Sequence, residues 1–319
     1  MKRNMNEREK HFDVIIIGGG AAGLSAALWC DELGLSTLLL EEKAELGGQL
    51  LWVYNAIENH LGVEAANGRE LRDCFTRQIE KRRFLKRLSA KVSAADLANK
   101  AVTLENGEEF SAQALIIATG VRRRKLGVEG ENAFAGKGII ESGKKDAAFT
   151  AGKEVLVIGG GDAALENALI LAEAANKIFL VHRRENFRGR KEFLEKVLRN
   201  QKIEIFTETV VRRFAGNETI NTVEIENLRT GELRSLPVQA VLIRIGVEPN
   251  TDILRGKIDL DADGYIKTDG NCETSVKGIF AVGDAANPLA LTVSSAVGTG
   301  ATAAKVIYSL LNFNKDTKK

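Results

Sequence analysis

The chain has 319 residues, of which 44% are hydrophobic and 28% are charged, and its formal net charge is +2. This is an ordinary globular composition with room for two domains, and nothing in the overall charge calls for nucleic acid as a partner. Only three cysteines occur, far apart and without a C-x-x-C, so we expect no disulfide framework and no metal site, as in a cytoplasmic protein. No apolar run approaches the roughly 18 residues of a membrane span.

The first predicted unit begins with an apolar, β-branched strand over 14–17. It leads into a G-x-G-x-x-G turn at Gly18, Gly20 and Gly23, and an apolar helical run follows. Such a turn brings the N-terminus of a helix against a pyrophosphate. Glu41 ends the second strand 23 residues after the first glycine, where a carboxylate accepts hydrogen bonds from ribose hydroxyls. The unit suits a dinucleotide with a free ribose, such as FAD or NAD, and the alternative is a glycine turn that binds nothing.

The middle of the chain is less strongly patterned. Residues 69–88 read as a basic amphipathic helix, and Asn106-Gly107 marks a hairpin between 101–104 and 109–110. A strand over 114–118 leads to Thr119-Gly120, which would bring backbone to the first cofactor. A connector of weak pattern then occupies 121–153.

The strand–turn–helix unit occurs a second time, with a strand over 154–158, the turn beginning at Gly159 and a further strand over 177–181. The position equivalent to Glu41 is His182, followed by Arg183 and Arg184, so a basic cluster replaces the acid. Arginines bind a 2′-phosphate through charge-assisted hydrogen bonds, whereas a carboxylate would repel it. This unit therefore suits NADPH, and the alternative is a solvated basic surface.

The remaining pattern predicts strands over 203–206, 222–227, 233–243 and 278–282, and a helix over about 294–311. Asp284 follows the strand that ends near Gly283, where a ligand binds in an α/β sheet, and it suits a hydroxyl of the ribitol of a flavin. We predict an α/β fold of two Rossmann-like domains, one inserted into the other. The outer domain comprises 11–121 plus 246–312, and the inserted domain comprises 122–245.

These motifs resemble those of the low-molecular-weight thioredoxin reductases and of their relatives, the thioredoxin-reductase-like ferredoxin–NADP reductases. The resemblance covers residues 12 to about 311, and rests on 18–23, 47–50, Glu58-Asn59, 118–120, 159–164, 182–188, 246–251 and 280–284. It implies FAD in the outer domain, NADPH in the inserted domain and a homodimer.

Motifs and resemblance together give the expected cofactor contacts. For FAD they are Gly18, Gly20, Ala21, Ala22, Gly23, Glu41, Glu42, Gly48, Gln49, Tyr54, Asn59, Val92, Ala118, Thr119, Gly120, Gly283, Asp284, Thr292 and Val293. For NADPH they are Gly159, Gly161, Asp162, Ala163, His182, Arg183, Arg184, Arg188 and Ile245.

The sequence departs from the thioredoxin reductases at the positions of the redox cysteines. Their C-x-x-C-D falls on residues 142–146, with Ser142 and Lys145 in the cysteine positions. In addition, Leu291-Thr292-Val293 stands where thioredoxin reductases usually have Arg-Gln-Ala. Tyr54 has the spacing of the flavin-stacking tyrosine of the ferredoxin–NADP reductases, although it suits a partly buried core position as well. Against that branch, the sequence stops near the last helix, and Glu58-Asn59 is typical of the disulfide reductases.

The expected function is NADPH-dependent electron transfer through FAD to an acceptor that is not a dithiol, without an obligatory acid–base side chain. Ferredoxin or flavodoxin is the leading acceptor, and a quinone or another small oxidant comes second. The alternative from another class is a flavin-binding redox sensor with little turnover. We expect neither nucleic acid nor a membrane span.

Overall fold

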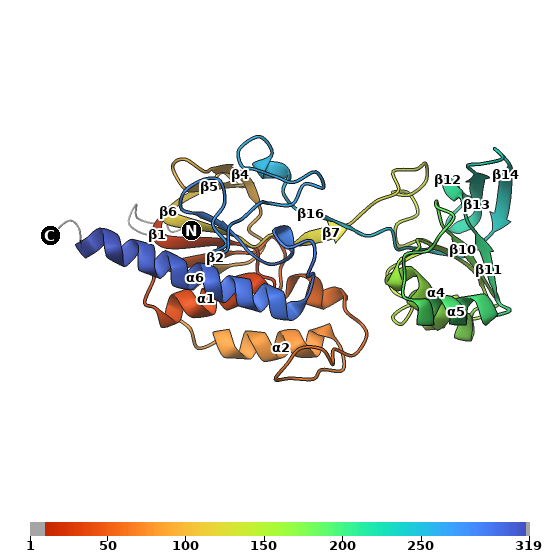
Figure 1. The fold of residues 1–319 in the computed structure, drawn as a ribbon, viewed down its shortest axis with the longest axis horizontal. Helices are drawn as coiled ribbons and strands as arrows, with labels where there is room; N and C mark the ends of the chain where they lie inside the picture. The colour runs from red at the N-terminus through yellow and green to blue at the C-terminus, as the bar shows by residue number, and fades with distance from the viewer. Residues whose placement is uncertain (1–9, 317–319) are drawn as a thin grey trace. The chain divides into compact units, whose positions relative to one another are not determined.

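The computed structural model describes residues 10–316, which divide into two compact units (Figure 1). One unit holds the described chain up to Arg122 together with the part from Glu248 onward, and the other comprises Arg123–Val247. The chain passes between the units in two short strands that pair with each other, β7 (Val121–Arg123) and β16 (Val247–Pro249). Among the described residues, no helix has the length and apolar character that crossing a membrane requires.

The first unit is built on a seven-stranded sheet in the order β3-β2-β1-β6-β5-β4, with β17 also paired to β6. Its strands are β1 (His11–Ile17), β2 (Thr37–Leu40), β3 (Leu85–Arg87), β4 (Val92–Asp96), β5 (Ala101–Leu104), β6 (Glu109–Ile117) and β17 (Ile279–Ala281). The long strand β6 lies parallel to β1 along its length. Its first half pairs with the antiparallel β5 and its second half with the parallel β17, so a distant part of the chain completes the parallel sheet.

Alternate residues of β1 pack on opposite faces of this sheet, as the period of a strand requires. Val14 and Ile16 belong to the core under the helices α1 (Ala21–Glu32) and α6 (Val293–Asp316), which lie side by side in Figure 1. Ile15 and Ile17 face the β4–β5 hairpin. Helix α2 (Gly68–Ile79) is capped at its N-terminus by Asn67, whose side chain accepts a hydrogen bond from the Glu70 backbone N–H. Short 3₁₀ segments complete the unit at η2 (Gly48–Trp52), η3 (Asp252–Leu254) and η4 (Gly283–Ala285).

The second unit has a five-stranded, all-parallel sheet in the order β11-β10-β9-β15-β8 and a separate antiparallel sheet in the order β12-β13-β14. Its elements are β8 (Ile139–Ile140), α3 (Ala147–Thr150), β9 (Glu154–Ile158), α4 (Asp162–Ala174), β10 (Lys177–Val181), α5 (Lys191–Arg199), β11 (Ile203–Phe206), β12 (Thr209–Gly216), β13 (Ile220–Asn227), β14 (Leu233–Pro237) and β15 (Ala240–Ile243). One face of the parallel sheet packs on α4 and α5, and the other packs on the antiparallel sheet.

Both units show the alternation of parallel strands and helices that defines the predicted α/β fold, and both glycine turns lie between a strand and a helix. The hairpin at Asn106-Gly107 is confirmed, since β5 and β6 are antiparallel and Gly107 has φ +82°. Two predictions of local structure are wrong. The helix over 69–88 ends at Ile79, and Leu85–Arg87 forms β3 because it pairs with the edge of β2. The strand over 233–243 is two strands in different sheets, divided after Pro237.

Candidate functional site

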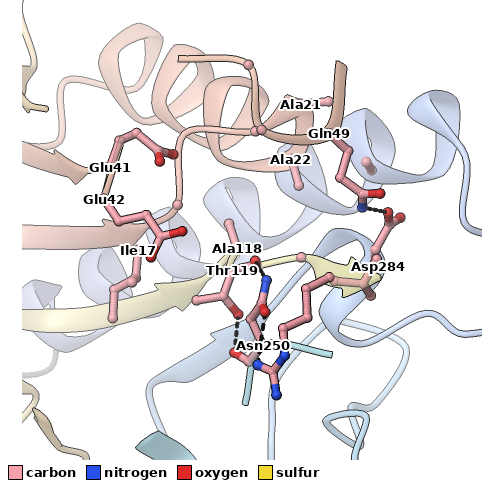
Figure 2. Close-up of a pocket in the computed structure, with 18 of the residues that line it drawn as sticks. Ile17, Ala21, Ala22, Glu41, Glu42, Gln49, Ala118, Thr119, Asn250 and Asp284 are labelled. Carbon is pink, nitrogen blue, oxygen red and sulfur yellow. Dashed lines mark hydrogen bonds between the residues drawn. The ribbon is translucent and has the colours of Figure 1, made fainter. Parts of the chain in front are cut away.

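A pocket of about 700 Å³ lies in the first unit, where β1, β2, β6 and β17 reach their carboxyl ends. This volume is within the range of small-molecule and cofactor sites, and the location is the one at which α/β sheets bind ligands. Figure 2 shows that its side chains come from distant segments of the chain. The structure brings together most of the residues that we expected to contact FAD, namely Gly18, Gly20, Ala21, Ala22, Glu41, Glu42, Gly48, Gln49, Val92, Ala118, Thr119, Gly120, Asp284, Thr292 and Val293.

Two glycine-rich turns meet at one end of this pocket, and both need residues without a side chain. Gly18 has φ +110°, and a Cβ there would lie 2.3 Å from the carbonyl oxygen of Ala118. Gly48 has φ +53°, and a Cβ there would lie 2.9 Å from the Cα of Gly20. The close approach leaves the backbone at the start of α1 uncovered, and the first turn of α1 contains no acidic residue. This is the arrangement that binds a pyrophosphate at a helix N-terminus.

Glu41 is buried and fixes the glycine turn from the end of β2. Its Oε2 accepts a hydrogen bond of 2.7 Å from the backbone N–H of Gly19, and its Oε1 accepts one of 2.9 Å from the backbone N–H of Lys43. An ionised carboxylate has about four lone-pair sites, so each oxygen retains capacity for a ribose hydroxyl. Glu42, the next residue, is exposed and also lines the pocket.

Asp284 and Gln49 lie next to each other in the lining of the pocket (Figure 2). The amide Nε2 of Gln49 donates a hydrogen bond of 2.7 Å to Oδ2 of Asp284. Burial raises the pKa of Asp284, and the hydrogen bond from Gln49 opposes that rise. The hydrogen bond therefore holds the carboxylate of Asp284 and the amide oxygen of Gln49 in fixed positions. Both groups accept hydrogen bonds, which suits a ligand that carries hydroxyl groups.

A hydrogen-bonded bridge joins the segment after β6 to the segment after β16, and sequence reasoning missed it. Thr119 Oγ1 donates to the Asn250 carbonyl at 2.9 Å, and Asn250 Nδ2 donates to the Thr119 carbonyl at 2.8 Å (Figure 2). Arg122 donates to Asn250 Oδ1 and forms ion pairs with Glu248 and Asp252. The hydrogen bond with Asp252 is the main cause of the raised pKa of Arg122. Asn250 lies in the stretch 246–251 of the family resemblance and Arg122 in the connector over 121–153, and only the fold brings them together.

Four residues that we expected to contact FAD are not among the residues that line this pocket, namely Gly23, Tyr54, Asn59 and Gly283. Gly23 and Gly283 make tight backbone contacts beside it, since a Cβ at Gly23 would lie 1.9 Å from the Gly18 carbonyl oxygen and one at Gly283 would lie 2.8 Å from the Cβ of Ala22. Tyr54 and Asn59 are not part of the lining, so their contact with a flavin stays a prediction. Residues that line the pocket and that we did not predict include Lys43, Trp52, Lys91, Arg122 and Asn250.

The second glycine turn occupies the carboxyl end of β9 in the second unit, and α4 begins at Asp162. The carboxylate of Asp162 accepts hydrogen bonds from the backbone N–H and the Nε of Arg190, at 2.6 and 2.9 Å. The backbone N–H of Arg188 donates to the Gly160 carbonyl at 2.8 Å. The basic loop is therefore held against the turn, with the side chains of Arg183 and Arg184 exposed beside it.

His182 has a different position from the neighbouring arginines because it is buried under the turn. A Cβ at Gly160 would lie 2.3 Å from the His182 ring, which stacks on Phe187 and places Nε2 3.1 Å from the Asn186 carbonyl oxygen. Burial lowers the pKa of His182, and the charge of Arg188 lowers it further. We therefore expect His182 to be neutral near pH 7 and to support the turn, while the arginines carry the positive charge.

The segment that aligns with the redox cysteines lies between β8 and α3. Ser142 is buried, and Asp146 Oδ2 accepts hydrogen bonds from the backbone N–H groups of Glu141 and Ser142, at 2.9 and 3.0 Å. Lys145 forms an ion pair with Glu141. The Gly143 N–H donates to Asn167 Oδ1 of α4 at 2.8 Å, which fixes this segment near the second glycine turn.

The three cysteines of the chain are free in the structure. Cys30 is buried in α1, and burial raises the pKa of its thiol to about 12. Cys272 is buried as well, with a raised pKa, and Cys74 lies in α2. All three belong to the first unit, whereas Ser142 and Lys145 belong to the second.

The sequence matches the family model described as pyridine nucleotide-disulphide oxidoreductase over residues 12–301. Relatives include a thioredoxin reductase of Streptomyces coelicolor, 35% identical over 92% of this chain and 91% of the relative. The 34.2 kDa protein in rubredoxin operon of Clostridium pasteurianum is 31% identical over 93% of this chain and 96% of the relative. The thioredoxin reductase of Lactococcus lactis (FR conformation) matches as a structure with a TM-score of 0.83 and 32% identity, over 93% of this chain and 98% of that chain. The thioredoxin reductase of T. acidophilum has a TM-score of 0.80 and 28% identity, over 94% and 98%.

Proposed function

The chain belongs to the pyridine nucleotide-disulphide oxidoreductase family. Within this family, we propose that it transfers electrons from NADPH to an acceptor that is not a dithiol. The protein is an NAD(P)H-dependent flavoprotein oxidoreductase of the thioredoxin reductase type, a family that uses FAD and NADPH. Ferredoxin or flavodoxin is our leading acceptor, and a quinone or another small oxidant is the second. This choice differs from what the names of many relatives suggest.

The observation that carries the proposal is the chemistry at residues 142–146. A hydroxyl at Ser142 and an ammonium at Lys145 cannot be oxidised to a disulfide, so no dithiol of this segment can exchange with a thioredoxin. The cysteines offer no replacement in this segment, because all three lie in the first unit. Cys30 and Cys272 are also buried with raised pKa values, which disfavours the reactive thiolate.

The two candidate sites suit the two cofactors by their chemistry. When bound, FAD supplies the hydride and single-electron chemistry. In the first unit, the N-terminus of α1 is available for the pyrophosphate, Glu41 for the ribose hydroxyls, and Asp284 with Gln49 for hydroxyls farther along. In the second unit, the N-terminus of α4 is available for a pyrophosphate, and Arg183 and Arg184 for the 2′-phosphate of NADPH.

An acidic protein carrier would be attracted by exposed cations, and the structure narrows the candidates. Basic residues are concentrated at 122–125 and at 81–87. Arg122 is engaged with Glu248 and Asp252, and the Nε of Arg124 donates to the Val247 carbonyl, so neither guanidinium is directed wholly to solvent. Lys81, Arg83, Lys86 and Lys125 are exposed and are our candidates for electrostatic steering.

The proposal is tested with an acceptor panel on the purified holoenzyme. NADPH oxidation is followed with ferredoxin coupled to cytochrome c, with flavodoxin, with a quinone and with thioredoxin coupled to a thiol assay. The relative from Clostridium pasteurianum is named for a rubredoxin operon, so a rubredoxin belongs in the panel. We expect turnover with a one-electron carrier, slower at high salt, and none with thioredoxin. Brisk thioredoxin turnover would refute the proposal, and no turnover with any acceptor would favour the flavin-binding redox sensor.

We also propose a homodimer, which we carry over from the family resemblance. Light scattering at micromolar concentration should give the mass of two chains. The mass of one chain would contradict this proposal without bearing on the acceptor.

A further inference from the structure

The second glycine turn carries an acid at the point where the first turn has none. Asp162 is the first residue of α4 and the acidic residue of its first turn, whereas the first turn of α1 contains no acidic residue. The side chain of Asp162 is 47% exposed. A helix dipole favours an acid at this position, but the same carboxylate would repel a pyrophosphate bound at the N-terminus of α4. The negative charge of Asp162 therefore has to be compensated before this turn suits a dinucleotide.

Arg190 holds both oxygens of this carboxylate. Oδ1 of Asp162 accepts a hydrogen bond of 2.6 Å from the backbone N–H of Arg190, and Oδ2 accepts one of 2.9 Å from its Nε. Among the residues that the structure describes, Arg190 is the cation that forms an ion pair with Asp162. The next cation in the chain, Lys191, pairs with Glu195 instead, at 3.7 Å. The charge of Asp162 is thus compensated by one guanidinium.

The backbone brings Arg190 to this position. The N–H of Gly189 donates to the Gly160 carbonyl at 3.1 Å, and a Cβ at Gly189 would lie 3.2 Å from the backbone nitrogen of Asp162. Arg190 is also the N-cap residue of α5, and its guanidinium carbon lies 4.5 Å from the centre of the Phe193 ring. The start of α5 and the start of α4 therefore fix Arg190 from two sides.

The folding energy of this ion pair does not account for it, because pairs as exposed as this one contribute little to stability. Its effect on a bound anion is larger. Two unit charges about 4 Å apart in water interact strongly enough to change an equilibrium constant about fivefold. A pyrophosphate carries two negative charges, so an uncompensated carboxylate beside it would weaken binding about tenfold or more.

We propose that Arg190 neutralises Asp162 and thereby allows the N-terminus of α4 to accept the pyrophosphate of the nicotinamide dinucleotide. Arg190 is a positioning residue in this scheme, since it acts through the carboxylate of Asp162. NADPH and NADH share the pyrophosphate, so the effect should apply to both, whereas Arg183 and Arg184 distinguish between them. The inference rests on the proposed function only in taking the second glycine turn as the NADPH site.

The test measures binding of NADP⁺ to the FAD-loaded protein by isothermal titration calorimetry, without turnover. The dissociation constant of Arg190→Gln should rise about tenfold. Asp162→Asn combined with Arg190→Gln should restore it to within about twofold of wild type, because the charge that needed compensation is gone. Lys191→Gln is the matched control, since it removes the same charge one residue along the chain from a side chain that pairs with Glu195. It should leave NADP⁺ affinity within about twofold of wild type.

Two further readouts separate charge repulsion from a structural role. The ratio of the NADP⁺ dissociation constants of Arg190→Gln and wild type should fall between about 0.05 M and about 0.5 M salt, because salt screens the exposed carboxylate. The probe 2′-AMP carries the 2′-phosphate but no pyrophosphate, so its affinity should be the same in Arg190→Gln and wild type. An equal loss for 2′-AMP and NADP⁺ would assign Arg190 to the 2′-phosphate and overturn the inference.

The inference would also be overturned by unchanged NADP⁺ affinity in Arg190→Gln, or by a double variant that binds as weakly as Arg190→Gln. If the thermal midpoint shows that Arg190→Gln does not fold, Asp162→Asn alone answers the question. It should bind NADP⁺ at least as tightly as wild type, and weaker binding would contradict the scheme. Calorimetry requires no acceptor, so thioredoxin turnover in the acceptor panel could refute the proposed function while these binding results still hold.

Discussion

Replacing Glu41 by glutamine tests how the first unit binds FAD. The carboxylate accepts two backbone hydrogen bonds, from Gly19 at 2.7 Å and from Lys43 at 2.9 Å, one on each oxygen. A glutamine has one oxygen and one NH₂ group, so either orientation leaves an N–H facing an N–H. The variant therefore loses one hydrogen bond to a charged acceptor, which contributes about 1.5–3 kcal/mol.

We expect this loss to appear in FAD binding, because Gly19 belongs to the turn that we propose as the pyrophosphate site, between Gly18 and Gly20 of the pocket lining. The FAD dissociation constant of Glu41→Gln should rise about 10- to 150-fold. The assay is titration of the apoprotein with FAD, followed by quenching of flavin fluorescence. Glu45→Gln is the matched control, since Glu45 lies in the same loop but pairs with Arg69. An FAD affinity within twofold of wild type for Glu41→Gln would refute the role of this carboxylate.

Three further predictions concern other positions. Replacing Arg183 and Arg184 together by glutamine should raise the KM for NADPH on the order of a hundredfold and leave the KM for NADH unchanged, because two charge-assisted contacts contribute about 3 kcal/mol. The control is Arg199→Gln on α5. If the wild type used NADH and NADPH with equal efficiency, the assignment would be contradicted. A crystal structure with FAD should place the Tyr54 ring against the isoalloxazine, and a distance beyond about 7 Å between the two ring centroids would exclude stacking. The pKa of His182 is lower in the folded protein than in the unfolded chain, so as the pH falls the unfolded chain takes up the imidazole proton before the folded protein does. The contribution of His182 to stability is therefore complete above about pH 6.5 and is lost as the pH falls below that value. His182→Gln should flatten the fall in thermal midpoint between pH 7 and 5, and an unchanged slope would show that other groups cause it.

Features that depend on neighbouring residues could be predicted from the sequence. The strand, glycine turn and helix of each nucleotide unit are adjacent in the chain, and both formed where the pattern placed them. The hairpin at Asn106-Gly107 and the absence of a cysteine pair at residues 142–146 needed no tertiary information either. Most of the residues predicted to contact FAD line one pocket, because the carboxyl ends of parallel strands meet at one edge of a sheet.

Features that depend on distant partners could not be predicted in this way. The run Lys81-Arg82-Arg83 continues a helical pattern, yet Leu85–Arg87 becomes a strand because the edge of β2 offers unpaired backbone groups. Helix α5 and strand β12 were missed, and the latter lies in an antiparallel sheet that only the fold assembles. Tertiary context overrides local preference in such segments because each residue's own bias amounts to only a fraction of a kcal/mol, whereas pairing and burial act on the whole segment at once.

The candidate sites divide in the same way. Glu41 and Arg183 were predicted from their distance to a glycine turn, because the βαβ unit fixes that distance within one short stretch of chain. Residue types alone did not separate the buried His182 from the exposed arginines beside it, and they did not place Arg190 on the carboxylate of Asp162. Asp162 and Arg190 are 28 residues apart in the chain, and only the packing of the loop after β10 against the second glycine turn brings them together.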